Sequence, residues 1–366
     1  MSANLRTPLC DLLGIRLPIL LAGMSGSSGP ELVAAVTRAG GLGVIGATGM
    51  TSAALERDIA RVRELAPESP FGVNLQLAPP TPATGERSRI LEVLRPFRRE
   101  LGLPDEPPEQ PPAENPVTLV EVALAAGVAV ITTFDDPEPV ARATQAAGAR
   151  LLPMVTTVNE AQRAVASGAD AVIAQGGEAG GHRGTFGVGG PTGPAAAARV
   201  GTLALVPQVV DAVGPELPVV ASGGIMDGRG IVAALALGAH GVSLGTRFLT
   251  ARESPVPDVY ADAIPATAAD CTVVTDAITG RPARWVRNRV VDALVEAGVG
   301  TLGWGRQAPL MADLRRAAAE QGRADLLPML AGEGAALSGA REPAAEIVAR
   351  LVRESQAALA ALAARS

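Results

Sequence analysis

The sequence predicts an α/β protein, a (β/α)8 TIM barrel with a smaller C-terminal cap domain inserted after the eighth strand. Short, continuously apolar runs alternate with helical patterns, which is typical of parallel strands that are covered on both faces. The chain has 366 residues, enough for a barrel with additions. Its residues are 48% hydrophobic and 19% charged, so it can bury a large core.

Eight apolar runs are expected to form the strands of the barrel. In chain order they are residues 18–24, 42–46, 71–77, 128–134, 151–156, 171–175, 218–223 and 241–248. Helical patterns lie between them at residues 31–39, 53–65, 117–126, 138–147, 159–167 and 230–237. Glycine follows most of these helices, as expected where a helix ends in a left-handed residue.

Segments that break the strand–helix rhythm set the expected domain boundaries. The barrel is assigned to residues 1–250, with an excursion at 78–116 whose proline-rich half is expected to be an extended surface linker. Residues 251–337 include a strand-like piece at 271–275, and we expect a cap over the mouth of the barrel. Residues 338–366 contain an amphipathic helix that should return to the barrel wall.

Charge and residue usage exclude several classes of protein. The net charge of −6 argues against nucleic-acid and membrane partners, and no stretch of about 18 residues reads as a membrane span. The two cysteines lack metal or redox spacing and no signal peptide is evident, so a cytoplasmic location is the simplest expectation. All 31 basic residues are arginine, which excludes Schiff-base and P-loop lysine chemistry. The two histidines lack a carboxylate cluster around them, so no metal site is expected.

Glycine and hydroxyl residues follow the last two strands. The seventh run ends in Ser222-Gly223-Gly224, and the eighth contains Gly245-Thr246 near its end. Glycine permits close approach to a ligand, and a following helix N-terminus favours negative charge. In (β/α)8 barrels these two loops commonly build a phosphate site. We therefore predict a ligand that carries phosphate; the alternative is that the glycines only form tight turns.

The segment after the sixth strand, residues 176–184, is rich in glycine and contains a histidine. The pair Gly180-Gly181 would let the backbone lie against a flat ligand, with His182 projecting beside it. Histidine is the natural acid or base near neutral pH, so we predict a catalytic role; the alternative is a structural histidine. His240 precedes the eighth strand at the opposite end of the barrel, where we expect a turn residue with satisfied hydrogen bonds.

Taken in order, these motifs resemble those of the nitronate monooxygenases, formerly called 2-nitropropane dioxygenases. The matching phrases are PILLAGMSG, FGVNLQL, GADAVIAQGGEAGGHRGTF, LVPQVVDAV, PVVASGGI, GTRFL, GRPAR and AGEGAALSG. The EAGGHRG block is the most specific of them, and the match covers nearly the whole chain. The resemblance implies an FMN-dependent barrel with a cap. Wider relatives are flavin-dependent enoyl-ACP reductases and NADH:quinone reductases.

The resemblance also implies a role for each matching position. His182 would be the catalytic base or proton-transfer residue that faces the flavin. Other positions would edge the ring and ribityl chain, lie along the flavin or hold the phosphate. These implied cofactor-binding residues are Ala22, Gly23, Met24, Asn74, Gln175, Gly180, Gly181, Ser222, Gly223, Gly224, Gly245 and Thr246.

Three functions are compatible with this resemblance. The first is oxidation of alkyl nitronates or nitroalkanes by O2 to carbonyl compounds and nitrite. The second is NAD(P)H-dependent reduction of an enoyl thioester or quinone, and the third is a flavin-binding barrel without turnover. The expected partners are a small-molecule substrate and O2, and a homodimer is one option for the assembly.

Some positions depart from the family's pattern. Thr132 and Thr133 stand where relatives often have a second histidine. Trp304 replaces part of a tyrosine-containing phrase, and Glu333 stands where glutamine is usual. We therefore expect an intact flavin site and an altered substrate site, with the alterations centred on Thr133 and Trp304.

Overall fold

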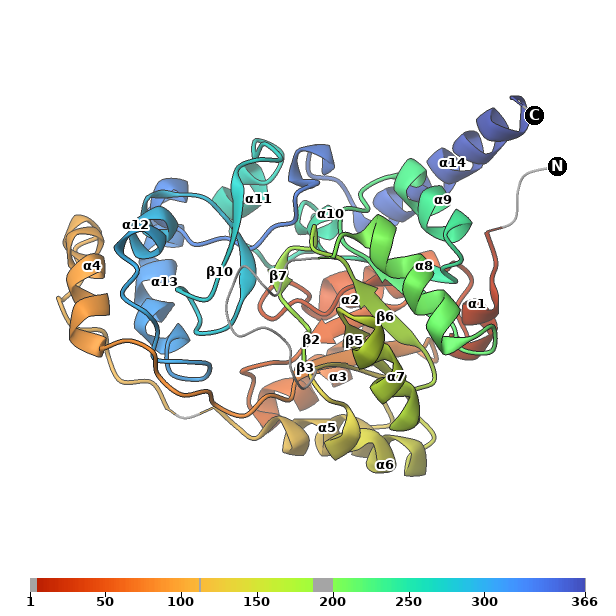
Figure 1. Ribbon diagram of the computed structural model, residues 1–366, viewed down its shortest axis with the longest axis horizontal. Coiled ribbons are helices and arrows are strands. Elements are labelled where there is room, and N and C mark those ends of the chain that lie inside the picture. Colours follow the sequence, from red (N-terminus) through yellow and green to blue (C-terminus); the bar gives the residue numbers. More distant parts are fainter. Residues whose placement is uncertain (1–4, 112, 187–199, 366) are drawn as a thin grey trace.

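The computed structural model describes residues 5–111, 113–186 and 200–365. A barrel lies on one side of the molecule, and a second group of helices and a small sheet lies over one of its mouths (Figure 1). We call this second group the cap; it comprises the elements between residues 251 and 337.

Eight parallel strands form the barrel sheet, and each overlaps a predicted run. They are β1 (Ile19–Leu21), β2 (Gly43–Gly46), β3 (Phe71–Gln76), β4 (Val130–Phe134), β5 (Arg150–Val155), β6 (Val172–Gln175), β8 (Val219–Ser222) and β9 (Gly241–Leu244). The strand order is β1-β9-β8-β6-β5-β4-β3-β2. A parallel bridge between Leu20 and Leu42 joins the two edge strands, which closes the barrel. The predicted (β/α)8 architecture is confirmed.

Helices surround the sheet. They are α2 (Pro30–Ala39), α3 (Ser52–Leu65), α5 (Pro116–Ala125), α6 (Glu138–Ala146), α7 (Val158–Ala166), α8 (Thr202–Val213) and α9 (Gly228–Ala236). All of them except α8 overlap a predicted helical pattern. Side chains at several helix starts accept a backbone hydrogen bond, as N-caps do: Thr51, Asn115, Thr157 and Asp227. The short helix α1 (Pro8–Leu13) buries Leu9 and Cys10 against the barrel interior.

The predicted end of the eighth strand is wrong. We expected extended chain over residues 241–248, but β9 ends at Leu244 and Thr246–Leu249 form the helical turn α10. The first N–H groups of a helix have no acceptor within it, so they remain available to other groups. The chain therefore turns into a helix start directly where the strand ends.

The cap has its own apolar core. Its elements are α11 (Asp258–Ala263), β10 (Thr272–Thr275), β11 (Ala283–Val286), α12 (Arg289–Ala297), η1 (Ala308–Met311), α13 (Ala312–Glu320), η2 (Ala324–Leu326) and η3 (Ala335–Leu337). Trp285 is fully buried in this core. Ile90 and Leu91 of α4 (Arg87–Glu100), from the excursion after β3, belong to the same cluster. The excursion thus contains a helix that packs on the cap, while the predicted domain boundaries stay predictions.

The C-terminal helix α14 (Ala344–Ala363) packs against α2 and α9. Ile347, Val348 and Leu351 lie in the barrel core. The last turns of α14 extend beyond the barrel (Figure 1). Within the parts of the chain given above, no helix is both long and apolar enough to cross a membrane.

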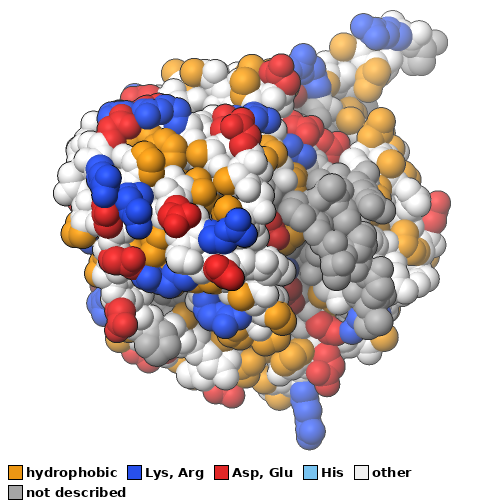
Figure 2. Space-filling model, turned by 60° about the vertical axis from the view of Figure 1, so that its left-hand side comes forward, with side chains coloured by type: hydrophobic (Ala, Val, Ile, Leu, Met, Phe, Trp, Pro, Cys, Tyr) orange, Lys and Arg blue, Asp and Glu red, His pale blue; other side chains and the backbone are white. Residues whose placement is uncertain are grey.

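The outer face of the cap mixes acidic and basic side chains (Figure 2). One ion pair in this region is buried, unlike the exposed charges on the outer face. Arg98 on α4 donates hydrogen bonds of 2.8 and 2.7 Å to the carboxylate of Asp313 on α13. The exposed fractions of the two side chains are 0% and 4%, so the pair is shielded from water. This bidentate contact fixes the excursion to the cap.

Replacing Arg98 with Ala should destabilise the protein, because Asp313 would keep its buried position without a cation. Removing one partner of a buried ion pair costs about 3–5 kcal/mol. The matched control is Arg99→Ala, since Arg99 pairs with Asp105 at exposed positions, where a pair contributes at most about 1 kcal/mol. Denaturant unfolding measures both, and equal losses in the two variants would contradict the assignment.

Candidate functional site

A cavity of about 960 Å³ opens at the carboxyl ends of the barrel strands, beneath the cap. His182 lines it, and so does every residue implied to hold the cofactor. These are Ala22, Gly23, Met24, Asn74, Gln175, Gly180, Gly181, Ser222, Gly223, Gly224, Gly245 and Thr246. The cap contributes further lining residues: Tyr260, Thr279, Trp285, Trp304 and Arg315. The fold therefore brings the predicted residues together, while their roles stay predictions.

One end of the cavity is formed by the loops after β8 and β9. Gly223 and Gly224 have φ of 111° and 71°, in the left-handed region that favours glycine. A Cβ on Gly223 would lie 3.0 Å from the backbone nitrogen of Ala179. The hydroxyl of Thr246 accepts a 3.0 Å hydrogen bond from the Gly332 N–H, so its own hydrogen can be donated to a ligand. Left-handed glycine turns and a hydroxyl that can donate thus line this end of the cavity.

Glycines also permit close backbone packing along the cavity. A Cβ on Gly23 would lie 2.2 Å from Cβ of Asn74, which is shorter than any real contact. A Cβ on Gly180 would lie 2.5 Å from the backbone nitrogen of Gly332. Any larger residue at either position would force the surrounding chain to move.

The two amide side chains are oriented by the protein. Asn74 Nδ2 donates a 2.8 Å hydrogen bond to Oγ1 of Thr132. Gln175 Nε2 donates to the carbonyl of His182 at 2.9 Å, and its Oε1 accepts from Gly184 N–H at 3.0 Å. Gln175 therefore positions the histidine loop in addition to lining the cavity, a role that the sequence did not indicate.

His182 is held by the cap and not by the barrel alone. Gly181 and His182 form the short strand β7 (Gly181–His182), which pairs antiparallel with Arg284 and Ala283 of β11. This pairing gives a three-stranded sheet with the order β10-β11-β7. The backbone that carries the histidine is thus an edge of the cap's sheet.

The imidazole has a defined hydrogen-bond partner. His182 Nε2 lies 2.9 Å from Oγ1 of Thr279, and that hydroxyl donates to the carbonyl of Arg281 at 3.3 Å. Because the Thr279 hydroxyl donates its hydrogen to this carbonyl, its oxygen can accept a hydrogen bond from Nε2. We therefore assign the tautomer that carries its proton on Nε2. Nδ1 is then unprotonated. The ring edges of Trp285 and Trp304 enclose the imidazole, with centroids 6.3 and 5.2 Å away.

The surroundings keep His182 neutral. Burial first, and then the positive charges of Arg281 and Arg315, lower the pKa of His182 from 6.5 to about 3. A neutral imidazole can accept a proton or a hydrogen bond across the physiological pH range. The imidazole can therefore act as a hydrogen-bond acceptor or as a weak base.

Two buried arginines fix the histidine loop. Arg183 donates to the carbonyls of Gln175 and Gly176 at 2.9 and 2.6 Å. The carbonyl of Arg183 accepts hydrogen bonds of 3.2 and 2.8 Å from Arg281. Arg281 also forms an ion pair of 2.6 Å with Asp135, next to β4. The phrases EAGGHRG and GRPAR contain these arginines, but their spacing in the sequence did not reveal the contact.

The comparison with known proteins identifies the family. The family model described as nitronate monooxygenase matches residues 6–354. The chain belongs to the nitronate monooxygenase family. It is 38% identical over 333 residues to a probable nitronate monooxygenase of Staphylococcus saprophyticus, covering 90% of this chain and 92% of that protein. A probable nitronate monooxygenase of Staphylococcus aureus is 37% identical over 350 residues, with coverage of 94% and 96%.

Solved structures agree with this assignment. Nitroalkane oxidase from Streptomyces ansochromogenes superimposes with a TM-score of 0.82 at 36% identity, covering 97% of this chain and 99% of that one. FabK from Thermotoga maritima gives a TM-score of 0.76 at 31% identity, covering 99% of both chains. As a family member, this protein is a flavin-dependent oxidoreductase.

Of the positions that depart from the family's pattern, only some line the cavity of this nitronate monooxygenase-family protein. Trp304 lines the cavity beside His182, as expected. The expectation for Thr133 is wrong: it is fully buried and does not line the cavity. Side chains alternate along a strand, so Thr132 points into the barrel with Asn74 and Thr133 points away. Glu333 is also outside the lining, because its carboxylate pairs with Arg284 at 2.9 Å.

His240 lies at the other end of the barrel, as predicted. Its Nδ1 accepts a hydrogen bond from Val219 N–H, and its own N–H donates to the carbonyl of Val219. Its carbonyl accepts from the hydroxyl of Thr7. It does not line the cavity, and we interpret it as a turn residue with satisfied hydrogen bonds.

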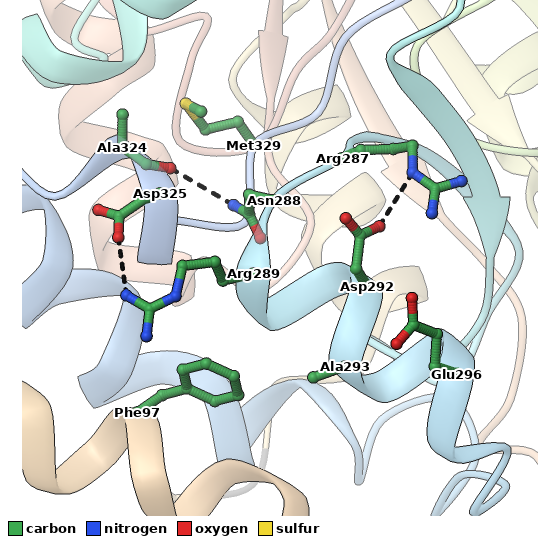
Figure 3. A pocket seen from close by; sticks show the side chains of 10 residues that line it. All are labelled: Phe97, Arg287, Asn288, Arg289, Asp292, Ala293, Glu296, Ala324, Asp325 and Met329. Carbon is green, nitrogen blue, oxygen red and sulfur yellow. Dashed lines mark hydrogen bonds and ion pairs between the residues drawn. The ribbon is translucent and has the colours of Figure 1, made fainter.

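A second hollow, of about 730 Å³, lies on the outer surface of the cap. Figure 3 shows that its polar side chains already pair with neighbours: Arg289 with Asp325, Arg287 with Asp292, and Asn288 with the carbonyl of Ala324. Glu296 is drawn there without a partner, and most of the other polar groups of this hollow are already engaged with one another. In the described parts of the chain, no group of three or more His, Cys, Asp and Glu could hold a metal ion.

The lowered pKa of His182 predicts how stability depends on pH. Below pH 6.5 the unfolded chain protonates this histidine and the folded protein does not, so stability should fall as the pH falls from about 6.5 toward 3. His182→Asn removes this contribution, worth roughly 3 kcal/mol at pH 4. Thermal unfolding between pH 7 and 4 should show a smaller loss of Tm in the variant than in the wild type.

The control for this prediction is His240→Asn. Burial lowers the pKa of His240 as well, but this imidazole has no cation as a further cause of the shift. Its replacement should change the pH dependence of Tm less than that of His182. Parallel curves for wild type and His182→Asn would show that His182 protonates normally in the folded protein.

Proposed function

We propose that this protein binds FMN non-covalently in the large cavity and oxidises alkyl nitronates, and more slowly nitroalkanes, with O2 to carbonyl compounds and nitrite. The observation that carries the proposal is the neutral imidazole of His182, held beside a glycine-lined cavity in a member of the nitronate monooxygenase family.

The residues present fit FMN. The left-handed turn at Gly223 and Gly224 and the start of α10 at Thr246 provide N–H groups suited to one terminal phosphate. At Gly23 and Gly180 the wall of the cavity is backbone without a side chain, and a Cβ at either position would collide with adjacent residues of the protein. Such surfaces suit a flat ring system. Bound FMN would supply the redox chemistry, by accepting electrons from the substrate and passing them to O2.

The proposed roles of the cofactor site follow from these positions. Ala22, Gly23 and Met24 would edge the ring through their backbone, and Asn74 and Gln175 through their side chains. Gly180 and Gly181 would lie along the ring. The residues proposed to hold the phosphate are Ser222, Gly223, Gly224, Gly245 and Thr246.

His182 is proposed to move the substrate's proton. With a neutral nitroalkane, Nδ1 accepts the proton from the carbon that bears the nitro group, and the bonding pair stays on the substrate as the nitronate. The imidazolium that forms keeps its Nε2 hydrogen bond to Thr279. The negative charge of the nitronate then compensates the new positive charge.

The low basicity of His182 favours nitronates over nitroalkanes. A base with a pKa of about 3 removes a carbon-bound proton slowly, whereas a preformed nitronate needs no such step. With a nitronate bound, the imidazole stays uncharged and lies beside the anion without transferring a proton. This is why we place nitronates first among the substrates.

Direct mixing tests the function. Under anaerobic conditions, the yellow protein should be bleached by a propane-2-nitronate solution, and readmission of O2 should release nitrite. Bleaching by NADH with no response to nitronate would support the reductase alternative. No bleaching by either compound would support a flavin-binding barrel without turnover.

The cofactor itself should be FMN. Heat release from the purified protein followed by chromatography should yield FMN; recovery of FAD, or a colourless protein that FMN does not reconstitute, would contradict the proposal. Gly23→Ala should lower the FMN content, because its Cβ would meet Asn74 at 2.2 Å. The control Gly29→Ala should retain FMN, since its Cβ has an ordinary 3.4 Å contact with Pro255.

His182→Asn separates proton transfer from binding. Turnover of nitroalkanes should fall, by at most the roughly 10²–10⁴-fold that a positioned base contributes when its pKa is near the operating pH. Turnover of preformed nitronates should fall less, because their proton is already gone. FMN content should stay near that of the wild type, which absorbance measures. Equal small losses on both substrates would mean that His182 only shapes the cavity.

A further inference from the structure

Arg315, on α13, is a half-buried cation without an anionic partner. Within the described residues, it forms no ion pair, and its Nε has no hydrogen-bond partner. Four other arginines in the interior of the cap or at its border with the barrel are paired with carboxylates. These ion pairs are Arg98–Asp313, Arg247–Glu342, Arg281–Asp135 and Arg284–Glu333. Arg315 thus differs from its neighbours, and it lines the large cavity.

A half-buried cation without a partner still costs free energy, so its retention calls for a partner that binds from outside. Burial lowers the pKa of Arg315. The nearby Tyr260 cannot neutralise it, because burial raises the pKa of this phenol to about 12. Its hydroxyl is also engaged, donating to the carbonyl of Leu330 at 2.6 Å and accepting from the Leu330 N–H at 2.8 Å.

The cavity offers Arg315 no carboxylate either. In the part of the chain that the structure describes, Glu114 is the one acidic residue of the lining, and its carboxylate accepts hydrogen bonds from the N–H and hydroxyl of Ser52. On the side of His182, the charges that act on the imidazole are those of Arg281 and Arg315. Arg281 is neutralised by Asp135. An excess positive charge therefore remains at Arg315.

We propose that Arg315 binds the substrate's anionic NO2 group and so makes the site selective for nitronates over neutral nitroalkanes. The guanidinium presents a planar fork of donors, which matches the two oxygens of a planar anion. Nitrite and nitrate have the same arrangement of oxygens, so they should bind at the same place. This inference rests on the proposed function, and it adds the residue that determines specificity.

The chain supplies a matched pair of variants. Arg315 and Arg316 are neighbours on α13, but Arg316 is exposed and does not line the cavity. Arg315→Gln, Arg315→Lys and the control Arg316→Gln are compared as FMN-loaded proteins. Titration with sodium nitrate, followed by the flavin absorbance, measures binding without turnover; sodium chloride at equal ionic strength corrects for salt.

The nitrate Kd and the KM for propane-2-nitronate should both rise roughly 10- to 100-fold in Arg315→Gln, as expected for loss of a hydrogen-bonded charge. Arg315→Lys should fall between this variant and the wild type, because an ammonium keeps the charge without the fork. The KM for neutral 2-nitropropane should change less than threefold, and Arg316→Gln should match the wild type throughout.

Several outcomes would overturn the inference. They are unchanged nitrate binding in Arg315→Gln, an equal effect in Arg316→Gln, or equal rises in KM for the nitronate and the neutral nitroalkane. The Tm should not fall in Arg315→Gln, since an unpaired half-buried charge is removed; should that variant fail to fold, Arg315→Lys carries the same comparison. If the wild type ignores nitronates but nitrate binding still depends on Arg315, the proposed function fails while the anion site stands.

Discussion

The site depends on the pairing of β7 with β11. Two residues cannot form a stable strand alone, so Gly181 and His182 depend on the hairpin that the cap supplies, in addition to the hydrogen bond from Gln175 of the barrel. The buried guanidinium groups of Arg183 and Arg281 strengthen this connection by binding carbonyls on both sides of it. The cap is therefore part of the catalytic geometry, and a barrel without it would lose the orientation of the imidazole even if its strands still folded.

Electrostatics follow from the same arrangement. Closing the cap over the strand ends buries His182 among two tryptophans and near two arginines, so its charged form is disfavoured. Keeping a neutral base and an unpaired arginine in one cavity lowers the stability of the folded protein. Functional sites commonly carry such local costs, which the rest of the fold offsets. Here the offset comes from the apolar core of the barrel.

Local patterns predicted most of the fold. The eight strands could be predicted because continuous apolar runs and helices that end in glycine depend only on residues close together in the sequence. The cavity residues could be predicted because the carboxyl ends of all the strands lie at one end of the barrel. What could not be predicted depends on contacts across long separations, such as β7 with β11 or Arg281 with Asp135. The error at Thr133 has a simpler origin, since a strand's face changes with every residue. The end of β9 was missed because Gly245 begins a helical turn that apolarity alone does not mark.

The altered substrate positions become coherent once their places are known. Thr132 supports Asn74, and Trp285 and Trp304 lie beside His182. These aromatic surfaces exclude water, and a charge interaction is stronger in such surroundings than in solvent. An apolar wall with one unpaired guanidinium suits a small molecule that is apolar at one end and anionic at the other. Alkyl nitronates have this form, whereas quinones carry no charge for Arg315 to bind. The combination of tryptophan walls and an unpaired arginine thus favours nitronate oxidation over quinone reduction.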